Sequence, residues 1–554
     1  MSLKNAPHFL LILLLLTACA VVKKNPAEQS FNTTDVARAE KLIGLEFSAA
    51  KRDSMLESLE YNLTCYKIIR ELHLENAVPP ALRFDPLPEN FNPDYVLATA
   101  PPPLPRDVAL PENPEDLAFY TVAELSELLR TRQVSSRQLM ELYLDRLQRY
   151  GPELECVVTL TTELAREQAD RADAEIAAGN YRGPLHGIPY GAKDLLAVAG
   201  YPTTWGAVPY QEQVIDETAT VIKKLDEAGA VLVAKLTLGA LAWGDVWFGG
   251  MTRNPWNLEQ GSSGSSAGPG SATAAGLVAF AIGSETWGSI VSPANRCGVT
   301  GLRPTYDRVC RTGAMTLSWS MDKLGPMCRS VEDCALVLAG IYGPTETDKS
   351  AFDIPFAFNP EVDLKSLKIG YLKEAFEEDY PARENDRKVL EVLTSLGAEL
   401  IPIGLPDLPV AELGFILSAE AAAAFDDLTL SGRDDLLVRQ IKNAWPNEFR
   451  TSRFIPAVEY IQANRVRYQL VRQMQELFQR IDVYVAPSFG GDNLLLTNLT
   501  GHPCVVVPNG FDAEGSPTSI SFIGRLFDEN TTLALARQYQ QATDWHRQYP
   551  PRYK

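Results

Sequence analysis

Two serine-rich segments and one isolated lysine are the parts of this sequence best suited to covalent catalysis. Ser265 lies in the segment GSSGSSAGPGSA, at residues 261–272. Lys193 lies in the glycine-rich, apolar segment GIPYGAKD, and Ser289 lies in GSETWGSI, just after an apolar run. A serine hydroxyl is a weak nucleophile until a neighbouring group takes its proton, and a neutral lysine can be that group. These residue types point to acyl transfer through a serine.

Composition alone leaves two other interpretations of residues 261–272. A run of glycine and serine is typical of a flexible linker, but this one leads directly into alanine-rich residues and an apolar strand. The letters GSSAG around Ser266 also match the Gly-x-Ser-x-Gly elbow of α/β-hydrolases, with His502 or His546 available as base. That elbow needs a strand immediately before it, whereas residues 253–260 are typical of a turn. An esterase that uses Ser266 is therefore the less favoured alternative.

Taken together, the segments resemble the motifs of the amidase signature family. That family shares a Gly-Ile-Pro-x-x-x-Lys-Asp segment, a Gly-Ser-Ser-Gly-Gly-Ser-Ala-like loop and a Gly-Ser-Ile segment, the last at the spacing that separates Ser265 from Ser289. The likeness continues through PANRCGVTGLRPT at residues 293–305 and NLTGHP at residues 498–503. It extends over about residues 118–545, with the motifs in the family's order.

The resemblance implies a Ser-Ser-Lys triad. In that arrangement Ser289 is the nucleophile, Ser265 is the bridging serine that follows a cis peptide bond, and Lys193 is the base. Backbone N–H groups would form the oxyanion hole, contributed by Thr286, Trp287, Gly288 and Ser289. Lys193 must then be desolvated, because a lysine in water is protonated, and its apolar neighbours suit that role. The other interpretation of Lys193 is a surface lysine whose stem packs against the protein.

Several positions depart from the family's usual residues. Ala267 and Pro269 stand where Gly and Ser are common in the loop, and Asp307 stands where Gly commonly follows Pro-Thr-Tyr. Trp287 stands where Gly is more frequent, close to the expected nucleophile. We expect its indole to narrow the acyl pocket or alter the oxyanion loop, which affects the range of substrates more than activity itself.

The elements around these motifs predict an α/β fold with a large mixed β-sheet covered by helices on both faces, and the resemblance implies the amidase signature fold. Helices are predicted over residues 121–130 and 135–150, and residues 384–479 are expected to be mainly helical and to cover the active-site side. Apolar, β-branched runs predict buried strands, mostly separated by helices, at residues 231–234, 278–282, 367–372, 483–486 and 504–507.

The N-terminus has the pattern of an exported, lipid-anchored protein. A start that carries Lys4, a short apolar run and the letters LTAC ending at Cys19 resemble a bacterial lipoprotein signal peptide. The apolar run is shorter than the roughly 20 residues that a membrane-spanning helix needs. We therefore predict a signal peptide over residues 1–18 and a lipid on Cys19. Ordinary cleavage without a lipid is the alternative; Ala20 favours the periplasmic face of the outer membrane over the inner one.

Composition changes again between the signal peptide and the signature motifs. Two helices are predicted between residues 32 and 74, and eleven of the chain's 38 prolines fall between Pro79 and Pro114. Such a proline density excludes regular helix and predicts an extended connector over a larger body. The expected order is a helical and proline-rich extension over residues 19–115, followed by a catalytic domain over residues 116–554.

Charge and cysteine usage exclude several classes of function. The chain has 70 acidic and 51 basic residues, a net charge of −19, which argues against a nucleic-acid surface. Seven cysteines remain besides Cys19, an odd number that does not indicate a disulfide framework, and no cysteines or histidines stand at metal-ligand spacing. We predict no metal, and the resemblance implies no cofactor.

These observations predict an amidase that hydrolyses a carboxamide of a small molecule to a carboxylate plus ammonia or an amine, through an acyl-enzyme. The A subunits of glutamyl-tRNA amidotransferases share the signature, but an export signal and an acidic balance argue against a tRNA role. The alternative from another class is a non-catalytic binding protein of the cell envelope that keeps the fold. The substrate's identity, the preference between esters and amides, and the oligomeric state do not follow from the sequence.

Overall fold

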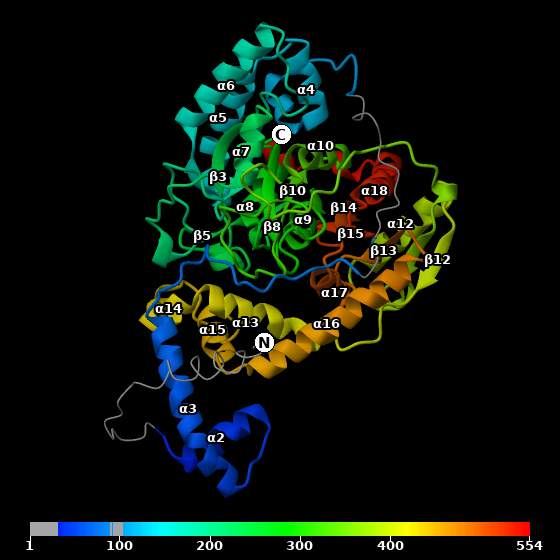
Figure 1. The fold of residues 1–554 in the computed structure, drawn as a ribbon. Helices are drawn as coiled ribbons and strands as arrows, with labels where there is room; N and C mark the ends of the chain where they lie inside the picture. Colours follow the sequence, from blue (N-terminus) through cyan, green and yellow to red (C-terminus); the bar gives the residue numbers. More distant parts are fainter. Residues whose placement is uncertain (1–30, 89–90, 92–103) are drawn as a thin grey trace, which may run out of the picture. The chain divides into compact units, whose positions relative to one another are not determined.

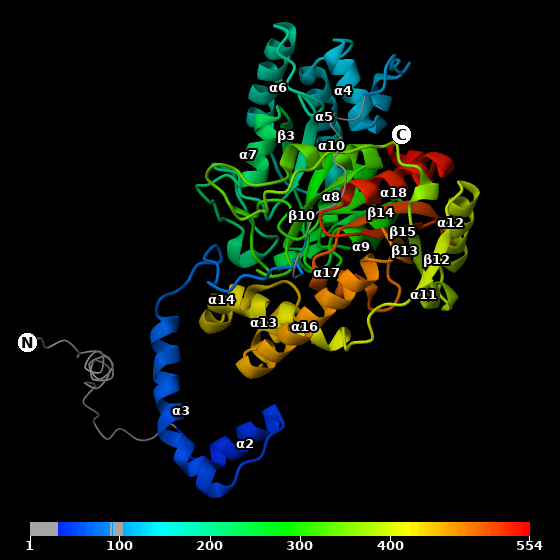
Figure 2. The ribbon, with the colours of Figure 1, turned by 45° about the vertical axis from the view of Figure 1, so that its right-hand side comes forward.

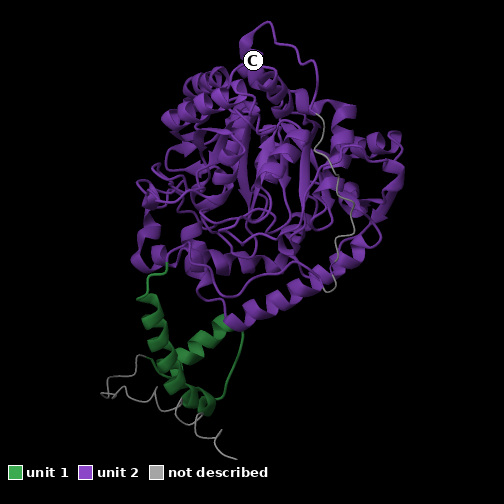
Figure 3. Cartoon of the chain, turned by 45° about the horizontal axis from the view of Figure 1, so that its top comes forward, with its two compact units in different colours: residues 1–74 green, residues 75–554 purple. Residues whose placement is uncertain are grey.

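A computed structural model describes residues 31–88, 91 and 104–554. The predicted signal peptide and Cys19 lie outside the described residues. The chain forms two compact units, Met1–Leu74 and Glu75–Lys554 (Figure 3). In the smaller unit, the two predicted helices are confirmed as α2 (Thr33–Ile43) and α3 (Ala49–Arg70). Within the described part of the chain, no helix combines the length and apolar character needed to cross a bilayer.

The described part of the proline-rich segment, which we assigned to the extension that ends near residue 115, packs within the larger unit. The Asn76 side chain donates to the carbonyl of Thr316 at 2.8 Å. Arg83 pairs with the buried carboxylate of Asp307 at 2.8 Å, and the ring of Phe84 packs edge-on against Tyr306. The described part of the connector therefore belongs structurally to the larger unit.

A single mixed sheet of eleven strands organises the larger unit (Figure 1). Strand β2 runs parallel to both of its neighbours, whereas β10 and β14 run antiparallel to theirs. In spatial order the strands are β1 (Val157–Leu160), β3 (Val231–Leu236), β2 (Pro189–Lys193), β8 (Phe280–Glu285), β10 (Lys323–Cys328), β9 (Thr300–Arg303), β14 (Cys504–Phe511), β15 (Pro517–Gly524), β13 (Val483–Pro487), β11 (Ile369–Leu372) and β12 (Leu400–Ile403).

Alternate residues of the strands belong to different hydrophobic clusters, which confirms that both faces of the sheet are covered. In β14, Val505 and Val507 join one cluster, while Val506 joins another. The first face packs against α4 (Val122–Arg130), α10 (Val331–Ile341), α12 (Arg383–Ser395) and α18 (Glu529–Thr543). The second packs against α5 (Ser136–Leu154), α8 (Ala267–Ala274), α9 (Val291–Cys297), α16 (Ala457–Phe478) and α17 (Asn493–Thr500). Figure 2 shows α10 and α18 together on one side, away from α16 and α17.

The segment over residues 384–479 is mainly helical, as predicted. Besides α12 and α16 it forms α13 (Phe415–Ala424), α14 (Asp426–Ser431) and α15 (Trp445–Ser452). The edge strand β12 also lies within it and was not predicted. The remaining helices of the core are α6 (Thr162–Ala177), α7 (Thr220–Glu227) and α11 (Lys373–Glu377).

Candidate active site

The sheet itself positions the lysine. Lys193 is the last residue of β2, and Ala192 of that strand pairs in parallel register with Ile282 of β8. Because parallel neighbours end at the same edge of a sheet, the residues that follow β8 come beside Lys193. Ser284 lies at this edge, and the chain continues through the expected oxyanion loop to Ser289.

Three hydroxyl groups surround the Lys193 amine. Its Nζ lies 2.8 Å from Oγ of Ser265, 3.1 Å from Oγ of Ser266 and 2.9 Å from Oγ of Ser284. The side chain is fully buried, and that burial holds the pKa of Lys193 well below its usual value. Asp322 and Glu285 raise the pKa only in part. The amine can therefore be neutral and accept a proton, and the surface-lysine interpretation is wrong.

The glycine- and serine-rich segment is a rigid part of the core and not a linker. The Gly264–Ser265 peptide bond is cis. The backbone N–H of Ser266 donates to the carbonyl of Ser289 at 3.1 Å, which joins this loop to the loop after β8. Ser265 and Ser289 are both buried. The structure thus places Lys193 within hydrogen-bonding distance of Ser265 and joins the loop of Ser265 to the loop that carries Ser289.

Close approach of two loops requires a glycine before Ser265. A Cβ atom built on Gly264 would stand 1.9 Å from the carbonyl oxygen of Gly244, well inside van der Waals contact. We expect Gly264→Ala to displace the loop and to lower amide turnover at least tenfold, because misplacing a catalytic group by a fraction of an ångström has effects of that size. Steady-state kinetics on purified protein tests this.

Gly404→Ala is the matched control for that substitution, because nothing lies within 4 Å of its Cβ position. Normal turnover in Gly264→Ala, with Gly404→Ala also normal, would show that the loop tolerates a side chain and that its position does not depend on this contact.

The loop from Thr286 to Ser289 leaves its N–H groups free. Within the described residues, no protein acceptor meets the backbone N–H of Thr286, Trp287, Gly288 or Ser289. Gly288 has a left-handed conformation with φ of 86°, and the Thr286 hydroxyl donates to Asp322 at 2.6 Å. Unpaired N–H groups beside a nucleophile can stabilise a developing oxyanion, which is the arrangement that the resemblance implies.

Glu285 binds the residues that follow this loop, and it was not singled out from the sequence. Its Oε2 accepts the backbone N–H groups of Ile290 and Val291 at 2.8 and 3.0 Å. Its Oε1 accepts from Arg303 at 2.7 Å and from Asn498 at 2.8 Å. Burial raises the pKa of Glu285, but Arg303 and these hydrogen bonds outweigh it and lower the pKa to about 2. The only sequence signal was a charged residue between apolar runs.

Neutralising Glu285 is expected to destabilise the fold by about 3 to 5 kcal/mol, because Glu285→Gln leaves the guanidinium of Arg303 buried without its counter-charge. Urea unfolding measures the loss. The control Lys373→Gln removes an exposed ion pair with Glu377 and should cost under about 1 kcal/mol. Equal losses in the two variants would show that the buried pair contributes no more to the free energy of unfolding than an exposed pair does.

One premise against the hydrolase elbow was wrong, because a strand does precede the loop. Strand β7 (Asn257–Gly261) pairs with β6 (Arg253–Asn254) in a separate two-stranded sheet. The surroundings of Ser266 nevertheless disfavour the elbow. Its Oγ contacts Lys193 and the backbone of Ser284. His502 instead contacts Thr500 and stacks on Phe478, and His546 lines a different cavity.

Trp287 is the exposed member of the site, with 46% of its surface accessible. Its indole lies 3.6 Å from the Cβ position of Gly414, just before α13. A cavity of about 20 Å³ lies beside the triad, lined by Ser284 and Thr286 together with Leu195, Ala314, Leu317 and Asp322. Trp287 does not line this cavity, so its effect on substrate entry stays a prediction.

Comparisons with known proteins point to one family. The family model described as Amidase matches residues 138–495. The A subunit of the glutamyl-tRNA(Gln) amidotransferase of Halorhodospira halophila (strain DSM 244 / SL1) is 34% identical over 478 residues, covering 78% of this chain and 98% of that protein. The corresponding protein of Roseiflexus castenholzii (strain DSM 13941 / HLO8), which has the same name, is 35% identical over 479 residues, covering 78% and 97%.

Among solved structures, the native peptide amidase from Stenotrophomonas maltophilia superposes with a TM-score of 0.70 at 29% identity, covering 78% of this chain and 98% of that one. An amidase family protein from Bacillus anthracis str. Ames gives a TM-score of 0.70 at 26% identity, covering 79% and 93%. Both matches extend over most of this chain and nearly all of the other.

Proposed function

The chain belongs to the amidase signature family, and we propose that it is a self-contained amidase that hydrolyses a small carboxamide through a Ser-cisSer-Lys triad. The family model is described as Amidase, and the similar proteins include amidotransferase subunits and a peptide amidase, all of which are named for reactions of amides. The observation that carries the triad is the buried amine of Lys193, 2.8 Å from the hydroxyl of Ser265. Burial holds the pKa of Lys193 well below its usual value, which favours the neutral amine that can accept a proton.

In the proposed reaction, Oγ of Ser289 attacks the amide carbonyl while its proton passes through Oγ of Ser265 to Nζ of Lys193. The carbonyl oxygen becomes an oxyanion held by the N–H groups of the loop from Thr286 to Ser289. Breaking the C–N bond returns the proton through Ser265 to the leaving nitrogen and leaves an ester on Ser289. A water molecule then attacks this ester by the same route, releasing a carboxylate and the free serine.

A site of this kind can serve two functions. It can release the ammonia or amine as a product of hydrolysis, or it can supply ammonia to another subunit of a larger assembly. The curated relatives are named as components of an amidotransferase, whereas a structural neighbour is a peptide amidase. The net charge of −19 disfavours a tRNA-binding role, as does the predicted signal peptide. We therefore propose a hydrolase that acts without a tRNA partner.

Turnover of a panel of primary amides, peptide amides, aryl acylamides and esters tests this proposal, together with labelling by a fluorophosphonate. Release of ammonia or amine by the purified chain alone supports it. Turnover only after addition of the tRNA-dependent partners of an amidotransferase would contradict it. Complete absence of labelling and of turnover would favour the non-catalytic binding protein.

Trp287 is expected to set the size limit of the substrate. Trp287→Ala removes the half-exposed indole beside the nucleophile, so kcat/KM for bulky aryl amides should rise roughly tenfold relative to a short aliphatic amide. Steady-state kinetics on both substrates measures the ratio. The exposed Trp545, at some distance in sequence from the site motifs, provides a control as Trp545→Ala. An unchanged ratio in Trp287→Ala would show that the indole does not limit entry.

We also propose that the mature protein is exported and anchored by a lipid on Cys19, on the strength of the LTAC pattern after the short apolar run. Cys19→Ser should move the protein from the membrane fraction to the soluble fraction and remove the lipid mass from its N-terminal peptide. Membrane association that persists in Cys19→Ser would contradict lipid anchoring.

A further inference from the structure

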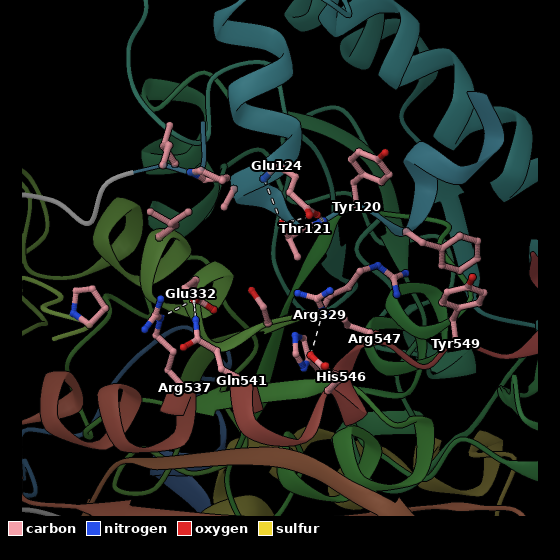
Figure 4. Close-up of a pocket in the computed structure, with 18 of the residues that line it drawn as sticks. Tyr120, Thr121, Glu124, Arg329, Glu332, Arg537, Gln541, His546, Arg547 and Tyr549 are labelled. Atoms are coloured by element: carbon pink, nitrogen blue, oxygen red, sulfur yellow. Dashed lines mark hydrogen bonds and ion pairs between the residues drawn. The ribbon is translucent and has the colours of Figure 1, made fainter. Parts of the chain in front are cut away.

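A second cavity, of about 850 Å³, lies among the start of α4, the region between β10 and α10, and the chain after α18. It has the size of a small-molecule site. Figure 4 shows Arg329, His546 and Arg547 close together in it, with Glu332, Arg537 and Gln541 in another part. No residue of the Lys193, Ser265 and Ser289 site lines this cavity.

Arg329 is the unusual member of its lining. The side chain is 6% exposed, and its Nε has no hydrogen-bond partner. Its Nη2 donates to the backbone carbonyl of Thr273, and the guanidinium lies 4.9 Å from the ring centre of Phe119. Among the described residues no carboxylate forms an ion pair with it. A buried cation without a counter-ion is costly, so a bound anion would stabilise this position.

Two ion pairs account for four charged groups of the cavity: Arg537 pairs with Glu332 at 2.5 Å, and Arg547 pairs with Asp544 at 3.2 Å. The lining also holds the cation of Lys554, whose Nζ lies 5.6 Å from the ring centre of Tyr549, and the carboxylates of Asp116, Glu124 and Glu361. Arg329 differs from the other cations because it is buried and, among the described residues, has no ion pair. It is therefore the cation that a bound anion would stabilise most.

Asp333 is the acid whose charge acts on Arg329, and it does not supply a full counter-charge. Its carboxylate accepts the backbone N–H of Ala123 at 3.2 Å, and burial raises its pKa to about 7. Burial likewise lowers the pKa of Arg329 to about 10, which reflects the same shortage of compensating charge.

Aromatic side chains stand next to this cation. Phe119 stacks on Tyr549 with ring centres 4.5 Å apart, and both line the cavity together with Tyr120. Arg146, which does not line the cavity, also lies against Phe119, with 5.1 Å to the ring centre. Flat apolar walls beside a guanidinium without an ion pair fit a planar organic acid better than an inorganic ion, which would fill little of the space.

We propose that this cavity is an accessory binding site for a small aryl carboxylate, whose carboxylate pairs with Arg329 while its ring packs against Phe119 and Tyr549. The site is separate from the catalytic one. Arg329 follows the last residue of β10, whereas Lys323 at the start of that strand pairs with Glu285 of the catalytic loop. Six residues of strand, roughly 20 Å, therefore lie between the two sites.

Calorimetric titration with benzoate tests the proposal on the full chain, with nitrobenzene as the neutral isostere and sulfate as the inorganic anion. Saturable binding of benzoate is expected, with nitrobenzene and sulfate each at least roughly tenfold weaker. Arg329→Met should weaken benzoate roughly tenfold or more, and Tyr549→Ala should weaken benzoate but not sulfate. Arg166→Gln, which removes an exposed guanidinium that does not line the cavity, is the control and should bind normally.

Equal benzoate affinity in Arg329→Met and wild type would overturn the proposal, and so would equal binding of nitrobenzene or tighter binding of sulfate. If Arg329→Met does not fold, Arg329→Lys decides, because it keeps the charge and loses the planar fork; unchanged affinity in both Arg329→Lys and Tyr549→Ala would reject the site. Benzoate binding should also persist in Lys193→Ala. Its loss there would assign the ligand to the catalytic site instead.

Discussion

Ser289→Ala is expected to reduce amide turnover by about 10⁴-fold or more and to abolish fluorophosphonate labelling. The substitution removes the oxygen that attacks the carbonyl, and no step of the acyl-enzyme route survives without it. The fold should change little, because Ser289 is nearly buried and alanine leaves only a small gap. Turnover of the best amide from the substrate panel, normalised to folded protein, measures the effect.

The neighbouring serines provide the controls for this result. Ser292, at the start of α9, contacts the hydroxyl of Ser263 at 2.7 Å. Ser292→Ala therefore tests the loss of a nearby hydroxyl without removing the nucleophile, and it should keep most of the turnover. Labelling that survives in Ser289→Ala but disappears in Ser266→Ala would assign the nucleophile to the elbow serine, contrary to the proposal.

Lys193→Ala is expected to lower kcat by about 10²- to 10⁴-fold, the usual contribution of a general base. In wild type the base is the neutral amine, so kcat/KM should rise with pH as Lys193 loses its proton. Since burial holds the pKa of Lys193 well below 10.5, the midpoint of this acid limb should lie at a pH well below 10.5. The limb should be absent from the residual activity of Lys193→Ala. The full pH profile of kcat/KM measures both effects.

A second buried lysine separates a catalytic role from a structural one. Lys323 is also fully buried with a pKa held well below its usual value by burial, but its Nζ contacts the carbonyl of Met321 and no serine. Lys323→Met should keep the acid limb even if turnover falls. Retention of that limb in Lys193→Ala would remove Lys193 from the proposed reaction.

Lys193 is expected to support activity but to destabilise the folded chain. The unfolded chain binds a proton at this lysine that the folded chain lacks, over the pH range between the lowered pKa and 10.5. Stability therefore increases with pH across that window, and the contribution opposes folding at its acid end. Replacing the amine by an apolar chain of similar length, as in Lys193→Met, removes this slope while it removes activity.

Much of the site was predictable because short motifs carry it. The glycine- and serine-rich segments and the lysine segment stand in the sequence in full, and the strands after 230, 280 and 483 are plain from their apolar runs. Strand β2 was not predictable, because PYGAK contains a proline and a glycine that local propensity assigns to a turn. Its strand conformation follows from pairing with two neighbours.

The residues that position the site were harder to predict than the candidate catalytic residues. Glu285 bonds with Asn498 across 213 positions of sequence, and nothing local marks them as partners. The contacts of the proline-rich segment are hidden for a similar reason, since proline density predicts an extended chain but not the residues against which Arg83 and Phe84 pack. Long-range pairing of polar groups is set by the finished fold and leaves no periodic pattern.

The order of strands also determines when this protein can fold during its synthesis. Strands β14 and β15 are made last, yet they lie in the interior of the sheet, between β9 and β13. In a chain that lacks residues 504–524, the remaining strands would form two incomplete sheets with open edges at β9 and β13. Open edges recruit other strands, so we expect any fragment that ends before Cys504 to aggregate.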